Sequence, residues 1–179
     1  MKNSKSLIAA AVLATASMGS SAVMATDITT PPQALNLVGA NAYFGDSFSI
    51  NQANDTFADR FTFSISGVAA DFNAIVSSIS RSPATGLDIT GLSLFTSAGT
   101  QVGTGGALEM GAIDIWSITS NHLAVGDYYL QVSGTLVSNT SGSFGGTVAL
   151  APVPEPASYG MMLAGLGLVG FMARRRGSK

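Results

Sequence analysis

The chain contains no cysteine, one histidine and few charged residues, which make up 10% of its 179 positions. Without cysteine, both a disulfide framework and a cysteine-ligated metal site are excluded. So few lysine, glutamate and arginine residues disfavour long solvated helices, whereas glycine is abundant, with 21 residues. The composition therefore favours a β-rich fold, and the length indicates one domain with tails.

Basic residues are scarce in the middle of the chain. Between Thr26 and Val153, only Arg60 and Arg81 oppose eight aspartates and one glutamate. An acidic segment repels a phosphate backbone, so we expect no nucleic-acid partner.

The N-terminus has the three-part pattern of a secretory signal peptide over 1–25. Two lysines precede an apolar stretch over 7–16, and small residues lead up to Ala25. We expect cleavage after Ala25, with Ala22 as the second choice. The alternative is an N-terminal membrane anchor, which the apolar stretch disfavours because it is shorter than the ~20 residues of a spanning helix.

The C-terminus carries an uncharged segment over 157–173, followed at once by Arg174, Arg175 and Arg176. At ~1.5 Å per residue such a helix reaches about 25 Å, which predicts a short transmembrane helix. The arginines act as a stop-transfer signal and should stay in the cytoplasm, so the N-terminal end of the segment would lie outside. A buried core helix is the alternative, but it would place three arginines at its end with few acidic partners.

Directly before this segment stands the motif Val153-Pro154-Glu155-Pro156. The two prolines lack a backbone N–H and disfavour helix in the residues before them, so this stretch should stay extended and accessible. A processing enzyme can bind an extended strand in its cleft, and the Glu155 carboxylate offers a contact for a basic residue there.

Pro-Glu-Pro, a glycine-rich apolar span and a terminal arginine run, together over 151–179, resemble the PEP-CTERM protein-sorting signal. The resemblance implies a protein of a Gram-negative bacterium that is a substrate of exosortase. Exosortase is a multi-pass membrane enzyme that acts as a transpeptidase at the motif. It also implies an inner-membrane-tethered precursor held by the C-terminal helix. Delivery to the cell envelope or extracellular matrix would follow, with association with exopolysaccharide or biofilm material.

Alternating apolar and polar residues over 26–150 predict a single all-β domain, a β-sandwich or jelly roll. Further strands are expected over 89–96, 112–119, 128–133 and 144–150, while 69–80 fits a short helix or a strand. Two faces stand out: Phe44, Asp46, Phe48 and Ile50 in one strand, and Phe57, Asp59, Phe61, Phe63 and Ile65 in the next.

The segment from Phe57 through Asp59 to Phe61 fits the FxDxF pattern that names one family of PEP-CTERM proteins. Phe44 to Phe48 fits the same pattern earlier in the chain. We align the family motif with the later copy because alternation continues beyond Phe61. The resemblance implies membership of that family.

Asp59 shares a strand face with the phenylalanines, so it is buried or at the rim of the core. A buried carboxylate needs backbone N–H groups from a loop, a bound cation or contact with water. Calcium could use Asp46, Asp55 and Asp71 as further ligands, but no calcium-loop pattern is present. We favour the backbone N–H groups and expect neither a metal nor a cofactor.

The strand over 126–134 is similar to the closing strand of secreted β-sandwiches such as bacterial pre-peptidase C-terminal domains. Tyr128, Leu130 and Val132 are expected to face the core and Tyr129 to face outward. An exposed Tyr129 could stack on a sugar ring, although pairing with a neighbouring strand is the stronger interpretation.

Three functions remain open, and we favour a non-catalytic envelope or matrix protein. The second is a carbohydrate-binding module that uses Tyr129 or Trp116. The third is a secreted hydrolase, which would depend on His122, the only histidine, or on Glu109, the sole glutamate of the domain. No Gly-x-Ser-x-Gly pattern accompanies them, so we assign no catalytic residue.

Overall fold

A computed structural model describes residues 24–153 and 156–176 of the chain. The predicted signal peptide and its alternative cleavage site at Ala22 lie outside the described residues, except for Met24 and Ala25. These two residues lie in an exposed segment without regular structure.

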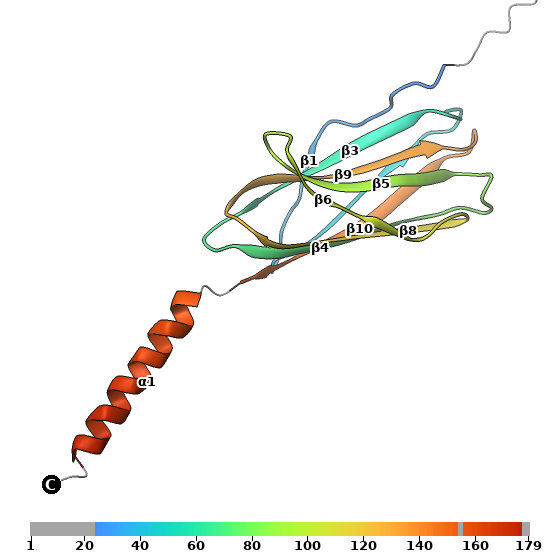
Figure 1. The fold of residues 1–179 in the computed structure, drawn as a ribbon. Helices are drawn as coiled ribbons and strands as arrows, with labels where there is room; N and C mark the ends of the chain where they lie inside the picture. The colour runs from blue at the N-terminus through green and yellow to red at the C-terminus, as the bar shows by residue number, and fades with distance from the viewer. Residues whose placement is uncertain (1–23, 154–155, 177–179) are drawn as a thin grey trace, which may run out of the picture.

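Two five-stranded sheets pack face to face (Figure 1), which confirms the predicted β-sandwich. All neighbouring strands run antiparallel except β1 and β3, which are parallel. The first sheet contains, in spatial order, β1 Gln33–Ala34, β3 Thr56–Ile65, β9 Gly126–Leu136, β5 Leu87–Thr96 and β6 Gln101–Thr104. The second contains β2 Asn41–Phe48, β10 Gly142–Pro152, β4 Ala70–Ile79, β8 Ile113–Leu123 and β7 Gly106–Glu109.

The period-two patterns hold where the strands are long. In β3 the five residues expected on one face are all buried, and in β9 Tyr128, Leu130 and Val132 are buried as predicted. Ile50 is an exception because β2 ends at Phe48, which leaves the Ile50 side chain 62% exposed. The undecided segment over 69–80 forms strand β4, whose even-numbered residues are buried against the core.

Aromatic rings from both sheets form one end of the core. The Phe57 ring from the first sheet packs against Phe48, with centroids 4.6 Å apart, and against Phe144, at 5.4 Å. Phe61 packs against Phe44 at 4.9 Å. Burying each such side chain stabilises the fold by about 1.5–3 kcal/mol, so the phenylalanines of the FxDxF pattern stabilise the contact between the sheets.

At one edge the chain passes directly from the first sheet to the second. Strands β6 and β7 are separated only by Gly105, whose N–H donates to the Leu92 carbonyl at 2.7 Å. A Cβ atom at Gly105 would lie 2.8 Å from the Ser117 carbonyl oxygen, so the crossing needs glycine. The two sheets are therefore tied together by the backbone at this edge.

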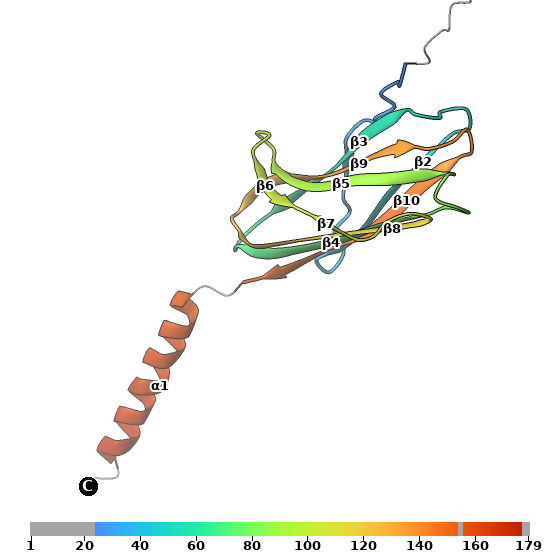
Figure 2. The same cartoon turned by 45° about the vertical axis from the view of Figure 1, so that its right-hand side comes forward.

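The helix α1, Pro156–Arg176, follows the sandwich (Figure 2). Its described side chains, from Tyr159 to Arg175, are exposed. Within the described ranges, no helix combines the length and the apolarity that a membrane crossing requires. The transmembrane helix expected over 157–173 is therefore not supported. Four glycines interrupt the apolar residues and arginines form the last turn, which leaves fewer than the ~20 apolar residues of a typical span.

Candidate functional site

The C-terminal motif begins where the sandwich ends. Pro152, the last residue of β10, lies opposite Ala70 of β4, and the Val153 N–H donates to the Ala69 carbonyl at 2.9 Å. Pro154 and Glu155 lie outside the described residues, and Pro156 is the first residue of α1. Strand β10 thus ends directly before the motif, two residues beyond the domain boundary expected at 150.

The arginine run forms the C-terminal turn of α1. Arg174 and Arg175 are exposed, and Arg176 ends the helix. Positive charge is favourable here because the last carbonyl groups of a helix carry partial negative charge.

Asp59 is held by the segment before β1. Its Oδ1 atom accepts the backbone N–H of Thr30 at 2.8 Å, so the structure shows the first of the three expected arrangements. The Thr30 hydroxyl lies 2.7 Å from Asp46 Oδ2 and 3.2 Å from Asp59 Oδ1. A hydroxyl has one proton to donate, and the shorter distance assigns it to Asp46. Thr30 therefore links two carboxylates and fastens the N-terminal segment to β3.

The environment of Asp59 favours its protonated form. The side chain is 1% exposed, and its Oδ2 atom has no hydrogen-bond partner among the described residues. Burial raises the pKa of Asp59, and the nearby charges of Asp46 and Asp27 raise it further, while the backbone hydrogen bond from Thr30 partly offsets the increase.

The four aspartates weighed as calcium ligands do not converge. Asp46 and Asp59 meet at Thr30, but Asp55 accepts the N–H of Thr26, and Asp71 accepts that of His122. Across residues 24–153 and 156–176, no three histidine or acidic side chains are grouped so that they could hold a metal ion.

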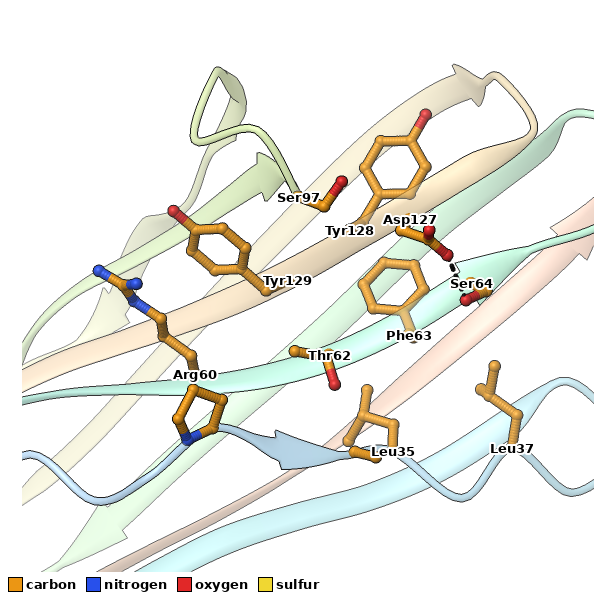
Figure 3. A pocket seen from close by; sticks show the side chains of 12 residues that line it. Leu35, Leu37, Arg60, Thr62, Phe63, Ser64, Ser97, Asp127, Tyr128 and Tyr129 are labelled. Atoms are coloured by element: carbon orange, nitrogen blue, oxygen red, sulfur yellow. Dashed lines mark hydrogen bonds between the residues drawn. The ribbon is translucent and has the colours of Figure 1, made fainter.

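An open groove of about 630 Å³ lies on the outer face of the first sheet (Figure 3). Pro32, Leu35 and Leu37 form one wall, from β1 and the residues around it, and the outward side chains of β3 and β9 form the floor. Figure 3 shows the Ser64 hydroxyl donating to Asp127 across these two strands, at 2.5 Å. The groove combines an apolar wall with polar groups on its floor.

Tyr129 lies in this groove as part of a stack across three strands. Its ring is stacked on Phe95, with centroids 5.0 Å apart, and the Arg60 guanidinium carbon lies 5.0 Å from the ring centroid. Phe95 and Arg60 come from β5 and β3, which flank β9 on opposite sides, so the ring has a partner on each side. The outward position of Tyr129 is therefore explained by pairing with neighbouring strands, which was the stronger of the two interpretations from sequence.

Trp116 is partly buried. It packs against the core from β8, and its indole Nε1 atom is buried without a hydrogen-bond partner in the described part of the chain. The inward face of β8 directs this side chain toward the core, and a contact between Trp116 and sugar stays a prediction.

The two candidate hydrolase residues lie far apart. Glu109 of β7 is opposite Ile115, and His122 follows seven residues later on β8, which corresponds to about 23 Å at ~3.3 Å per residue. The side chain of His122 is 71% exposed, and its Nδ1 atom lies 3.7 Å from Asp71.

One buried carboxylate was missed by the sequence interpretation. Asp114 of β8 is 2% exposed and accepts hydrogen bonds from Ile89 N–H, Gly111 N–H and the Ser78 hydroxyl, each at 3.0 Å. The sequence pattern that could have identified Asp114 is the same as for Asp59: an aspartate at an inward position of an alternating strand.

The fold and its C-terminal extension define a class of protein, a β-sandwich followed by a sorting segment. Residues 152–176 match the family model of the PEP-CTERM protein-sorting motif. This motif implies an exported protein that is directed to the cell envelope and processed by exosortase. The match confirms the predicted sorting signal, while membership of the FxDxF family stays a prediction.

The other comparisons concern the whole chain. No curated protein matches it. Among solved structures, it is similar to the pre-peptidase C-terminal domain of a collagenase from Bacillus anthracis, at 20% identity and a TM-score of 0.38. The alignment covers 66% of this chain and 97% of that one. A likeness of this size says nothing about the activity of this chain.

Proposed function

We propose that this protein is a non-catalytic component of the cell envelope or extracellular matrix, delivered by exosortase processing at Pro154 to Pro156. The observation that carries the proposal is the sorting motif over 152–176, which starts directly at the end of a folded domain. The sandwich would be the delivered part, associated with exopolysaccharide or biofilm material.

The position of the candidate hydrolase residues supports a non-catalytic role. A serine hydrolase needs its histidine within hydrogen-bond reach of a nucleophile, and a paired-carboxylate glycosidase needs two carboxyl groups within about 10 Å. His122 is directed to Asp71, and Glu109 lies on the exposed strand β7.

The test of delivery is the intact mass of the protein recovered from an exosortase-containing host. We expect a C-terminus between Val153 and Pro156, and additional mass there if the product is joined to another molecule. Glu155→Ala should abolish processing, whereas Glu109→Ala, which changes the chain's other glutamate, should leave it unchanged. A mass that includes Lys179 in the wild type and in both variants would overturn the proposal.

A carbohydrate-binding role is the second candidate, and the groove of Figure 3 favours it because it places Arg60, Thr62 and Asp127 beside an apolar wall. Planar and polar side chains in such a groove can bind sugar hydroxyls. We expect retention on isolated matrix polysaccharide, reduced by Arg60→Ala. Arg81→Ala, which changes a basic residue outside the groove, is the matched control, and equal retention of both variants would contradict this role.

A further inference from the structure

The stretch between the sandwich and α1 is short. Strand β10 ends at Pro152 and α1 begins at Pro156, so three residues separate them. Clefts that bind extended peptides pair with the backbone of several successive residues and hold alternate side chains in pockets. Three residues span only about 10 Å at ~3.3 Å each, so a cleft that holds the motif as a strand also requires neighbouring residues.

The residues on the N-terminal side of the motif are already paired within the sandwich. Leu150, Ala151 and Pro152 lie opposite Phe72, Asp71 and Ala70 of β4, and the Val153 N–H donates to the Ala69 carbonyl. While these contacts persist, the edge of β10 that faces β4 cannot pair with an enzyme. The last strand therefore competes with the processing enzyme for the same backbone.

This end of β10 is held far less firmly than the rest of the strand. Phe144 and Val148 are buried, at 5% and 0% exposure, and Val148 is the last buried side chain of β10. Beyond it, Ala149, Ala151 and Pro152 are exposed, and Leu150 is partly buried against the core. Pairing with β2 also stops at Ala149, apart from the Leu150 N–H, which donates to the Ala40 carbonyl at 2.8 Å.

Opening the end of β10 would break a few backbone hydrogen bonds and expose one partly buried apolar side chain, that of Leu150. Strand ends with these properties open locally without unfolding the domain. The buried Val148 side chain sets the limit of such an opening, because unpairing the residues before it would expose the core.

From these contacts we propose that residues 149–153 are part of the segment that exosortase binds, and that they leave the β4 edge before the motif is processed. This inference rests on the proposed processing of the chain. The strand end then sets the rate of processing through the population of its open state.

The absence of cysteine allows a direct test. Asp71→Cys with Ala151→Cys places two thiols at opposite positions of β4 and β10, near the end of the ladder. Ser77→Cys with Gly145→Cys is the matched control, because this pair lies on the same two strands, at the same alternation, six residues earlier. Each purified precursor is oxidised or reduced, its disulfide is verified by mass, and its processing by exosortase-containing membranes is followed.

We expect the oxidised 71/151 variant to be processed at least about tenfold more slowly than its reduced form, since processing tracks the open population. The control pair should be processed at the wild-type rate in both redox states. Equal rates for the oxidised and reduced 71/151 variant would overturn the inference while leaving exosortase processing intact. If the wild type itself is not processed, the proposed function fails and the inference fails with it.

Discussion

Asp59 illustrates how a buried charge is accommodated at the residue scale. Its one accepted backbone N–H comes from Thr30, and its second oxygen is buried without a partner among the described residues. Burial and the neighbouring Asp46 and Asp27 all raise its pKa. The residue stabilises the N-terminal segment through Thr30, but its ionised form carries a desolvation cost.

Replacing Asp59 should separate these two effects. A raised pKa means that the folded state binds the proton more tightly than the unfolded state does. The contribution of Asp59 to the free energy of unfolding therefore falls as pH rises from about 4 toward 7. Asp59→Asn keeps an acceptor for Thr30 and removes the titration, so we expect its stability relative to the wild type to improve over that range. Chemical denaturation at several pH values measures this, and parallel curves would contradict it.

Asp59→Ala leaves the Thr30 N–H without its acceptor. We expect a loss of about 1–3 kcal/mol relative to Asp59→Asn at any one pH. Equal stability of the two variants would show that the hydrogen bond from Thr30 contributes nothing.

Gly134 shows how tightly the core is packed. A Cβ atom at this position would lie 2.4 Å from Phe57 Cζ and 2.5 Å from the Asp88 carbonyl oxygen. We expect Gly134→Ala to destabilise the fold by about 1–3 kcal/mol or more. Gly91→Ala is the control, since its Cβ would meet only Ser133, at an ordinary 3.8 Å. Denaturation midpoints compare the two, and similar losses would contradict the packing argument.

At the scale of elements, Asp114 connects the two sheets. It lies on β8 in the second sheet, and it accepts the N–H of Ile89 on β5 in the first. Ile89 lies beside the register shift of β5 against β9, which falls between Ile89 and Gly91. The Asp114 carboxylate thus accepts a backbone N–H of one sheet from a strand of the other.

Asp114→Ala should therefore weaken this contact between the sheets. Two backbone N–H groups lose their acceptor, whereas the Ser78 hydroxyl can still donate to the Leu87 carbonyl at 3.0 Å. We therefore expect a loss of about 3 kcal/mol or more and faster hydrogen exchange at Ile89. Asp127→Ala removes an exposed carboxylate bonded to Ser64 and should cost about 1 kcal/mol or less. A similar loss in both variants would argue against a special role for Asp114.

At the scale of the whole molecule, the stability of the sandwich does not depend on contacts with α1. The described helix side chains are exposed and contribute nothing to the core cluster. A processed product that ends near Val153 retains every strand of both sheets.

Shortening the chain should reveal this independence. We expect a chain that ends at Val153 to match the full chain within about 0.5 kcal/mol in its free energy of unfolding. A chain that ends at Thr147 loses the buried Val148 and the pairing beyond it, so it should be markedly less stable. Urea denaturation provides the comparison, and a clear loss in the Val153 chain would show that the C-terminal segment stabilises the sandwich.

The sequence alone determined the features that contiguous residues carry. The Pro-Glu-Pro motif with its arginine run is one such feature, because its chemistry lies in neighbouring positions. The inward faces of β3 and β9 are another, because alternation in a long strand fixes which side chains are buried. The same short-range logic overestimated the span over 157–173, where glycines and arginines limit the apolar length.

Only the tertiary structure decided which distant residues meet. Thr30 reaches Asp59 across 29 positions of sequence, and Arg60 and Phe95 flank Tyr129 from different strands. It also decided that β4 is a strand, since its place between β10 and β8 satisfies its backbone on both edges. Such contacts depend on strand order and register. Both are set when distant strands pair, and the local sequence pattern does not encode them.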